Sequence, residues 1–123
     1  MPKKILVVDD SATIHFMIRM VLGKDRRFEL VTANDGREAV EKARTEKPDL
    51  VVMDVVMPHM TGFEACRVMR GDHATRDIPI ILVTTRGEAE SVQKGYECGC
   101  SDYVTKPING LELLAKVASC LGE

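Results

Sequence analysis

Continuous apolar runs alternate with amphipathic segments from one end of the chain to the other. Three runs, at residues 5–8, 50–53 and 80–83, are rich in β-branched side chains, which is typical of strands buried on both faces of a parallel sheet. Residues 28–33 and 102–105 are weaker strand candidates. The pattern therefore predicts five strands.

Amphipathic segments follow these strands and indicate helices. Ser11 is suited to cap the first helix at its N-terminus, and the second, from about residue 35 to 46, is closed by Pro48. The third is expected at about 61–70 and the fourth at about 88–97. The residues expected on the buried faces are Ile14, Met17, Ile18, Val21 and Leu22 in the first helix, Phe63, Cys66 and Met69 in the third, and Leu111, Leu114, Ala115, Ala118 and Leu121 in the fifth.

A strand followed by a helix, five times over, predicts an α/β fold with right-handed crossovers. Helices would then cover both faces of a doubly wound, five-stranded parallel sheet. The chain has 123 residues, of which 45% are hydrophobic and 29% charged, a balance typical of one globular domain with its own core. We find no repeat, linker or low-complexity stretch, so we expect a single domain over residues 1–123.

Charge and hydropathy narrow the class of protein. The chain has 17 Lys and Arg against 19 Asp and Glu, a net charge of −2, which argues against a general nucleic-acid binder. No apolar run approaches the roughly 18 to 20 residues of a membrane span, and no signal peptide opens the chain. We therefore expect no membrane insertion and a cytoplasmic location. The four cysteines, at positions 66, 98, 100 and 120, lack the spacing of a disulfide framework or a zinc site, and we interpret them as reduced packing residues.

Polar residues stand where four of the predicted strands end. Open α/β sheets bind ligands in the crevice outside the carboxyl ends of their strands, so these side chains are expected to converge on one edge of the sheet. They are Asp9 and Asp10 after the first strand, Asp54 after the third, Thr84 and Thr85 after the fourth, and Lys106 after the fifth.

Three carboxylates in one crevice repel each other and favour a bound cation. Their hard oxygen atoms suit Mg²⁺, which we expect Asp9 and Asp10 to hold with help from Asp54. Asp54 ends the most apolar strand and stands alone, which makes it the candidate nucleophile toward phosphorus. Lys106 would supply a positive charge, and Thr84 a hydroxyl donor, to the oxygens of a transferred phosphoryl group.

Five motifs are spread over nearly the whole chain. They are V-V-D-D-S at 7–11, A-N-D-G-R-E-A at 33–39, M-D-V-V-M-P-H-M-T-G at 53–62, L-V-T-T at 82–85 and D-Y-V-T-K-P at 102–107. In order, spacing and residue type this set resembles the CheY-like receiver domain of two-component response regulators. The resemblance implies a flavodoxin-like (βα)5 fold with strand order 2-1-3-4-5.

The resemblance also implies roles for the strand-end residues. Asp54 would accept a phosphoryl group from a histidine kinase or a histidine phosphotransfer protein, and Thr84 and Lys106 would contact that group. The ligands of Mg²⁺ would be Asp9, Asp10, Asp54 and the backbone carbonyl of Val56. Self-phosphorylation from a phosphodonor and autodephosphorylation would be the only reactions, so we do not expect an enzyme in the ordinary sense.

Phosphorylation would be read out as a change in a protein-interaction face. The resemblance implies that Thr84 moves inward and that Tyr103, the aromatic switch residue, buries its ring in response. The face formed by the fourth helix, the fifth strand and the fifth helix would then be recognised differently by a downstream target protein. The peptide bond before Pro107 would be cis.

Two features add to the family pattern. β-branched Thr85 stands where the family usually has a very small residue, and we expect it, with Val56 and Arg86, to hinder attacking water and lengthen the phosphorylated lifetime. Phe16 and Met20 lie four residues apart on the first helix, opposite its buried stripe, so they should be exposed neighbours. We consider two interpretations of this pair: scattered surface apolar residues, or a docking patch for a helical phosphodonor.

Other functions are weighed against this one. A receiver fold used as a phosphorylation-independent interaction module is the main alternative. A Mg²⁺-dependent phosphohydrolase of the haloacid dehalogenase type would need Asp-x-Asp after the first strand, but Ser11 stands two residues after Asp9. A flavodoxin-type module is disfavoured because the Asp9–Asp10 pair would repel the phosphate of the flavin, and the glycine motifs of nucleotide-binding folds do not occur.

The output pathway is left open by the sequence. The chain ends just after the fifth predicted helix, so we expect output through protein contact and not through a DNA-binding domain. Motor control in chemotaxis, phosphorelay shuttling and regulation of another enzyme all fit this expectation. So do a monomer and a phosphorylation-dependent dimer.

Overall fold

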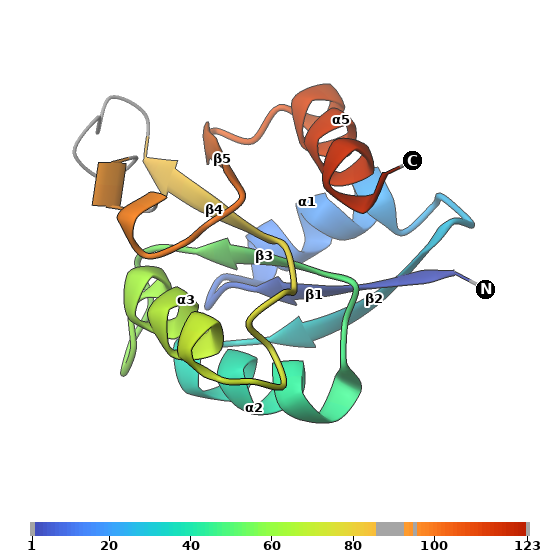
Figure 1. Cartoon of the computed structure of the whole chain (residues 1–123). Helices are drawn as coiled ribbons and strands as arrows, with labels where there is room; N and C mark the ends of the chain where they lie inside the picture. The colour runs from blue at the N-terminus through green and yellow to red at the C-terminus, as the bar shows by residue number, and fades with distance from the viewer. Residues whose placement is uncertain (1, 86–92, 95, 123) are drawn as a thin grey trace.

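A single parallel sheet with strand order β2-β1-β3-β4-β5 organises the protein, as the sequence implies (Figure 1). The computed structural model describes residues 2–85, 93–94 and 96–122. The strands are β1 (Lys3–Val8), β2 (Phe28–Ala33), β3 (Leu50–Asp54), β4 (Ile80–Thr85) and β5 (Asp102–Lys106). The helices are α1 (Ala12–Leu22), α2 (Gly36–Glu46), α3 (Gly62–Gly71) and α5 (Gly110–Leu121). The expected fourth helix falls largely outside the described residues, although residues 93–94 and 96–97 are helical.

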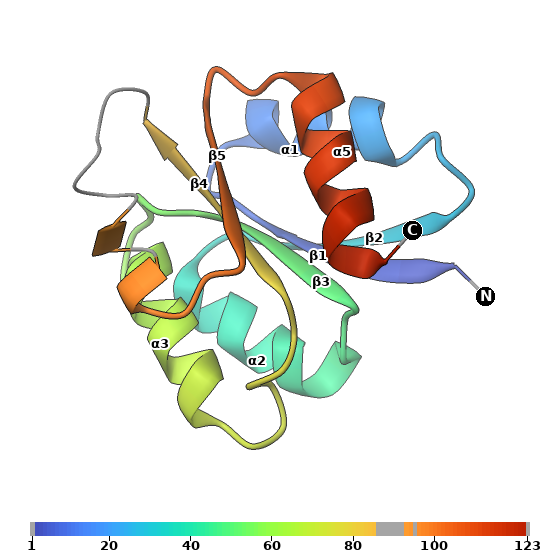
Figure 2. The same ribbon diagram turned by 45° about the horizontal axis from the view of Figure 1, so that its top comes forward.

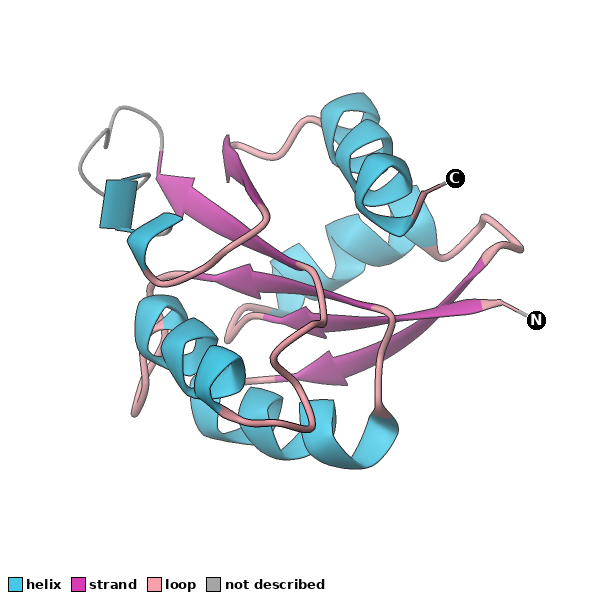
Figure 3. Ribbon diagram, viewed as in Figure 1, coloured by secondary structure: helices cyan, strands magenta, loops and turns pink. Residues whose placement is uncertain are grey.

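The apolar runs of the central strands are buried on both faces of the sheet. Successive side chains point to opposite faces of the sheet, so each strand contributes to two separate cores. Leu6 and Leu82 pack in the core beneath α2 and α3, whereas their neighbours Ile5 and Ile81 pack in the core beneath α1 and α5. Figures 1 and 2 show the two pairs of helices on opposite sides of the sheet, and Figure 3 separates the sheet and helix layers by colour. Within the part of the chain that the structure describes, no helix is long and apolar enough to cross a bilayer.

The buried face of α1 differs from the expected one at Met17. Ile18 and Leu22 are fully buried, and Ile14 and Val21 pack against them, but Met17 is 37% exposed. Met17 precedes Ile18 by one residue, a turn of about 100° around the helix, and so lies at the edge of the contact with the sheet. The expectation that Met17 belongs to the core was therefore wrong.

The buried face of α5 is rotated from the expected one. Leu113 and Val117 are fully buried, whereas Leu111 is 81% exposed and Ala115 is also exposed. This helix carries apolar residues on more than one side, so spacing alone allowed two stripes. Packing against the sheet selects the stripe that contains Leu113 and Val117.

Polar N-cap residues start every helix whose bounds are given above. Each side chain accepts a hydrogen bond from the backbone amide three residues later, which satisfies a donor that the helix itself leaves free. Thr61 and Glu64 form a reciprocal capping box at the start of α3. The N-caps are Ser11, as the sequence predicts, together with Asp35, Thr61 and Asn109.

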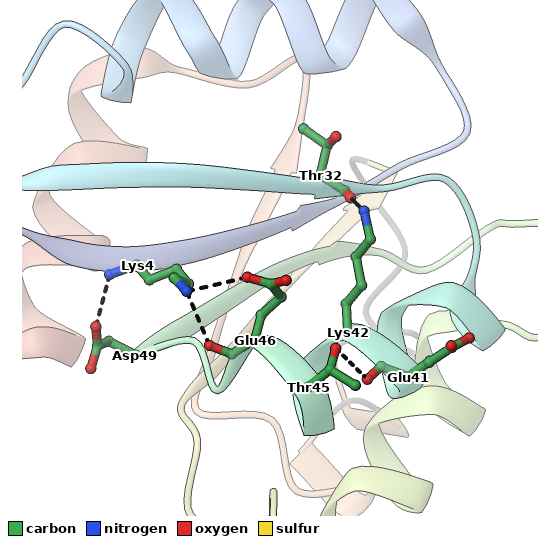
Figure 4. A network of polar contacts seen from close by, with 7 residues as sticks. All are labelled: Lys4, Thr32, Glu41, Lys42, Thr45, Glu46 and Asp49. Carbon is green, nitrogen blue, oxygen red and sulfur yellow. Dashed lines mark hydrogen bonds and ion pairs between the residues drawn. The ribbon is translucent and has the colours of Figure 1, made fainter.

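A polar network ties α2 to the strands that it covers (Figure 4). The backbone amide of Lys4 donates to the Asp49 carboxylate at 2.7 Å, and the Lys4 ammonium contacts the carbonyl and a carboxylate oxygen of Glu46, each at 3.2 Å. Lys42 reaches from α2 to the carbonyl oxygen of Thr32 in β2. These contacts lie away from the buried cores and fix the end of α2 relative to β1 and β3.

The guanidinium group of Arg70 joins three segments at the end of α3. Its Nε donates to the Gly99 carbonyl at 2.8 Å, and Nη1 donates to the carbonyls of Arg76 and Ile78 at 3.0 and 2.6 Å. Its Nη2 lies 3.5 Å from Oγ of Ser101. The planar fork of an arginine suits several acceptors at once, so this side chain fixes the segments that lead into β4 and β5.

We predict that Arg70→Lys lowers the free energy of unfolding by about 2 kcal/mol, because a lysine ammonium cannot reach the same carbonyl oxygens and leaves them without a charged donor. Urea unfolding followed by circular dichroism measures the change. Arg37→Lys, at an exposed position of α2, is the matched control and should stay within about 0.5 kcal/mol of the wild type. Equal effects of the two substitutions would contradict the role of Arg70.

Candidate functional site

The parallel sheet brings the predicted polar residues together at the carboxyl ends of its strands. Asp9 directly follows β1, Asp54 is the last residue of β3, and Lys106 is the last residue of β5. The strand arrowheads in Figure 1 point to this edge. Asp9, Asp10 and Asp54 each offer a carboxylate oxygen, and these oxygens lie within 4.8 Å of one another. The expected acidic cluster is therefore present.

Lys106 places its ammonium group against two of the three carboxylates. Its Nζ lies 3.3 Å from Oδ2 of Asp54 and 3.7 Å from Oδ2 of Asp9. The Lys106–Pro107 peptide bond is cis, the isomer that the sequence resemblance implies. The positive charge expected at the end of the fifth strand thus faces the expected nucleophile.

Burial dominates the electrostatics of the site. Asp54 is 5% exposed and Asp9 is 1% exposed. Burial raises the pKa of Asp54, the nearby Asp9 carboxylate adds to the rise, and Lys106 opposes it. Burial also raises the pKa of Asp9. The backbone amide of Ser11, which donates to Oδ1 of Asp9 at 2.9 Å, and the Lys106 ammonium group both lower this pKa, but burial has the larger effect. The surroundings of both carboxylates disfavour their negative charge. Binding of a cation in addition to Lys106 would therefore stabilise the ionised carboxylates.

The donor set fits a hard divalent cation. Oδ2 of Asp9 is buried and has no hydrogen-bond partner among the described residues, so it has a lone pair to offer. Asp10 is exposed and can supply an oxygen from the solvent side. Carboxylate oxygens with room for water ligands suit Mg²⁺. Asp9, Asp10 and Asp54 are the residues that could hold it.

The loop after Asp54 is packed closely against the start of α3. The backbone amide of Gly62 donates to the Val55 carbonyl at 2.8 Å, and a Cβ atom at Gly62 would lie 2.4 Å from the carbonyl oxygen of Asp54. A glycine is therefore required here. Val56 lies in this loop with its side chain 72% exposed, and the metal-binding role expected for its carbonyl stays a prediction.

Thr84 and Tyr103 share one face of the sheet. Thr84 is 2% exposed, and its Oγ1 lacks a hydrogen-bond partner in the part of the chain that the structure describes. In the β4–β5 register Tyr103 pairs with Leu82, two residues before Thr84, so the side chains of Thr84 and Tyr103 point to the same side on neighbouring strands. The side chain of Thr85 and the whole of Arg86 lie outside the described residues, so the effect expected of them stays a prediction.

His15 is a site residue that the sequence analysis missed. Its Nε2 lies 2.6 Å from the carbonyl oxygen of Asp9, so the first turn of α1 is tied to the acidic cluster. The position one helical turn after the N-cap Ser11 was the available signal, but a lone histidine in a helix has too many roles for this to be decisive.

The exposed pair on α1 is where the sequence places it. Phe16 is 62% exposed and Met20 is 46% exposed. Met17, at 37% exposure, extends the pair to three neighbouring apolar side chains on the same helix.

The cysteines are packing residues in the described structure. Cys66, Cys98 and Cys100 are buried and free, and Cys120 is half-buried. Burial raises the pKa of the Cys66 thiol to about 12 and that of Cys100 to about 11, so both stay protonated at neutral pH. The burial of Cys66, Cys98 and Cys100 agrees with the interpretation of the cysteines as packing residues.

Residues 5–118 match the family model of the response regulator receiver domain. The chain belongs to this family. As a receiver domain it is 40% identical over 121 residues to the alkaline phosphatase synthesis transcriptional regulatory protein PhoP of Bacillus subtilis, a match that covers 98% of this chain and 49% of that protein. The chain spans about half the length of the curated relatives that it matches.

Solved receiver structures superpose closely on this receiver domain. The chemotaxis response regulator CheY4 of Vibrio cholerae is 36% identical, with a TM-score of 0.90 over 98% of this chain and 100% of that chain. The receiver domain of the sensor histidine kinase PA1611 of Pseudomonas aeruginosa is 26% identical, with a TM-score of 0.90 over 100% of both chains. The latter was crystallised with a magnesium ion coordinated in its active-site cleft.

We predict that Asp54→Asn stabilises the metal-free receiver domain at neutral pH by about 1 kcal/mol, a rise of about 4 °C in the unfolding midpoint. The substitution removes a buried carboxyl group whose pKa is raised by burial above its ordinary value of about 3.8. The stability that protonated Asp54 contributes is fully present below about pH 3.8 and is lost as the pH rises through the higher folded-state pKa.

The advantage of Asp54→Asn should accordingly vanish in acid and grow with pH. Thermal unfolding in the presence of a chelator, from pH 3.5 to 7.5, measures this profile. Asp77→Asn, whose side chain is 94% exposed, is the control and should show no such growth. A variant less stable than the wild type at pH 7 would mean that the ion pair with Lys106 outweighs burial.

Proposed function

We propose that this receiver domain accepts a phosphoryl group on Asp54 from a histidine kinase or histidine phosphotransfer protein and so switches a protein-interaction face. The observation that carries the proposal is the Lys106 ammonium group, 3.3 Å from the Asp54 carboxylate beside Asp9 and Asp10. A nucleophile, a counter-charge and a set of hard oxygen ligands thus lie within one crevice.

The transfer reaction requires these groups in defined roles. An oxygen of ionised Asp54 attacks phosphorus, the bond from phosphorus to the donor nitrogen breaks, and the leaving imidazole keeps the electron pair and takes up a proton. Lys106 is close enough to Asp54 to neutralise a phosphoryl oxygen once the new bond has formed. Hydrolysis of the aspartyl-phosphate by water returns Asp54 to its carboxylate.

Mg²⁺ is the proposed cofactor of this step. Asp9, Asp10 and Asp54, with the Val56 carbonyl, would hold it. A bound Mg²⁺ neutralises the charge that the carboxylates and the phosphoryl oxygens bring together. Two observations support this assignment: Oδ2 of Asp9 has no hydrogen-bond partner among the described residues, and the similar PA1611 receiver was crystallised with magnesium.

The switch is proposed to run from Thr84 to Tyr103. A phosphoryl group on Asp54 brings strong acceptor oxygens to the site, and the Thr84 hydroxyl, which has no hydrogen-bond partner among the described residues, is free to donate to one of them. Movement of Thr84 changes the space on the face that it shares with Tyr103. The surface around Tyr103 then presents a different shape to a downstream target protein.

We predict that acetyl phosphate with Mg²⁺ adds one phosphoryl group to the wild-type chain, measured by intact mass. Asp54→Asn and a chelated sample should show no gain, because the acceptor or the cation is missing. Asp77→Asn, at an exposed position, should be phosphorylated like the wild type. No gain under any condition would favour a phosphorylation-independent interaction module, and a gain in Asp54→Asn would place the acceptor elsewhere.

The exposed apolar surface of α1 is proposed to dock the helical phosphodonor. Phe16 and Met20 come from the helix whose N-terminus adjoins Asp9 and Asp10, so a donor bound there lies next to the phosphoacceptor. We predict that Phe16→Ala slows phosphotransfer from a histidine kinase about tenfold, since buried aromatic anchors dominate interface energies.

The same variant should be phosphorylated by acetyl phosphate at the wild-type rate, because this small donor needs no docking surface. Val68→Ala, at an exposed apolar position of α3 on the other side of the sheet, is the matched control for both donors. Radiolabelled transfer on a gel measures the kinase reaction. An unchanged rate of transfer from the kinase to Phe16→Ala would contradict docking at this surface and would favour the interpretation of Phe16 and Met20 as scattered surface apolar residues.

A further inference from the structure

Both tyrosines of the chain meet in one aromatic pair. The rings of Tyr96 and Tyr103 have centroids 6.0 Å apart and planes at 88°, an edge-to-face arrangement. Such pairs are favourable because the positive edge of one ring meets the negative face of the other. Tyr96 is 49% exposed, so it contributes little to the core, and its ring contacts the ring of Tyr103.

Lys116 holds Tyr103 from α5. Its Nζ lies 4.8 Å from the centroid of the Tyr103 ring, a cation–π contact, and also donates to the Tyr103 carbonyl oxygen. The same ammonium group lies 3.4 Å from Oδ1 of Asp102. This oxygen also accepts a hydrogen bond from the backbone amide of Tyr103 at 2.8 Å. The backbone of Tyr103 is thus fixed to α5, and the part of the residue left to move is its ring.

The two ring contacts depend on one orientation of Tyr103. Rotation of the side chain would break the edge-to-face contact with Tyr96 and move the ring away from Lys116, while the backbone contacts with Lys116 and Asp102 stay. Interactions present in one conformation alone shift the equilibrium between conformations by their own free energy. The Tyr96 contact is therefore of the kind that stabilises the resting state of a switch.

We propose, on the basis of the function proposed above, that Tyr96 is a positioning residue: with Lys116 it holds the Tyr103 ring in its resting orientation and so opposes phosphorylation of Asp54. Phosphorylation favours the moved ring, and binding free energies are reciprocal, so a ring that is easier to move makes phosphorylation easier. Tyr96 touches neither Asp54 nor the phosphoryl group and acts through Tyr103.

The test compares Tyr96→Leu with Tyr96→Phe. Both variants leave Tyr103 as the sole tyrosine in a chain without tryptophan, so its ring signals in NMR are unambiguous. The phenylalanine keeps an aromatic edge against Tyr103, and the leucine removes it. The ring resonances of Tyr103 should differ between Tyr96→Leu and Tyr96→Phe. Acrylamide should quench the fluorescence of Tyr103 more strongly in Tyr96→Leu than in Tyr96→Phe.

The same variants are then exposed to limiting acetyl phosphate with Mg²⁺, and the phosphorylated fraction is measured by intact mass. Tyr96→Leu should raise the ratio of phosphorylated to unphosphorylated chain about two- to tenfold, the range expected for one aromatic pair, and Tyr96→Phe should stay close to the wild type. Phe63→Leu is the matched control, since the ring of Phe63 on α3 contacts the ammonium group of Lys94, two residues before Tyr96.

Each outcome decides between the two proposals. Equal ratios in Tyr96→Leu and Tyr96→Phe, in a chain that is phosphorylated, would overturn the role of Tyr96 alone. An equal rise in Phe63→Leu would also overturn it, because loss of the Lys94–Phe63 contact would then have the same effect as loss of the Tyr96 ring. A wild-type chain that takes up no phosphoryl group would instead overturn the proposed function, and with it the coupling of Tyr96 to phosphorylation.

Discussion

Two buried carboxylates facing one ammonium group set the conditions for the rest of the molecule. Asp9 and Asp54 are nearly inaccessible, and Lys106 contacts both. β1 and β3 are neighbours in the sheet, and β5 lies beyond β4, so the three residues meet only if the strand order is correct. The topology of the sheet is thus what turns separate strand ends into one charged crevice.

The apolar core holds the residues of this crevice in place, but the buried charges of the crevice do not stabilise the fold in return. Burial disfavours the charge on both carboxylates, whereas the apolar strands on each side of the site are packed on both faces. Functional sites commonly carry such locally unfavourable arrangements, which the surrounding packing offsets. The receiver domain therefore keeps two unfavourably placed carboxylates in the crevice that is proposed to bind a cation and a phosphoryl group.

The pattern of the sequence was sufficient for the strands and for the polar residues at their ends, whereas the strand order followed from the resemblance to receiver domains. Continuous apolar runs mark strands buried on two faces, and the residues at the ends of parallel strands meet at one edge. It was not sufficient for the helix faces: the spacing favoured Leu111, which is exposed, whereas packing against the sheet buries Leu113. The contacts of His15 and Tyr96 depend on residues from other elements, and no local spacing encodes such pairs.

Gly62 limits how this protein can vary in evolution. Its missing side chain lets α3 start against the loop that follows Asp54, where a Cβ atom would lie 2.4 Å from the Asp54 carbonyl oxygen and 2.9 Å from Cα of Val55. Every missense change in a glycine codon adds a Cβ atom, so no mutational step at this position is small. Neighbouring side chains can change gradually in evolution. The backbone beside Asp54 is preserved, because any residue other than glycine at position 62 would clash with it.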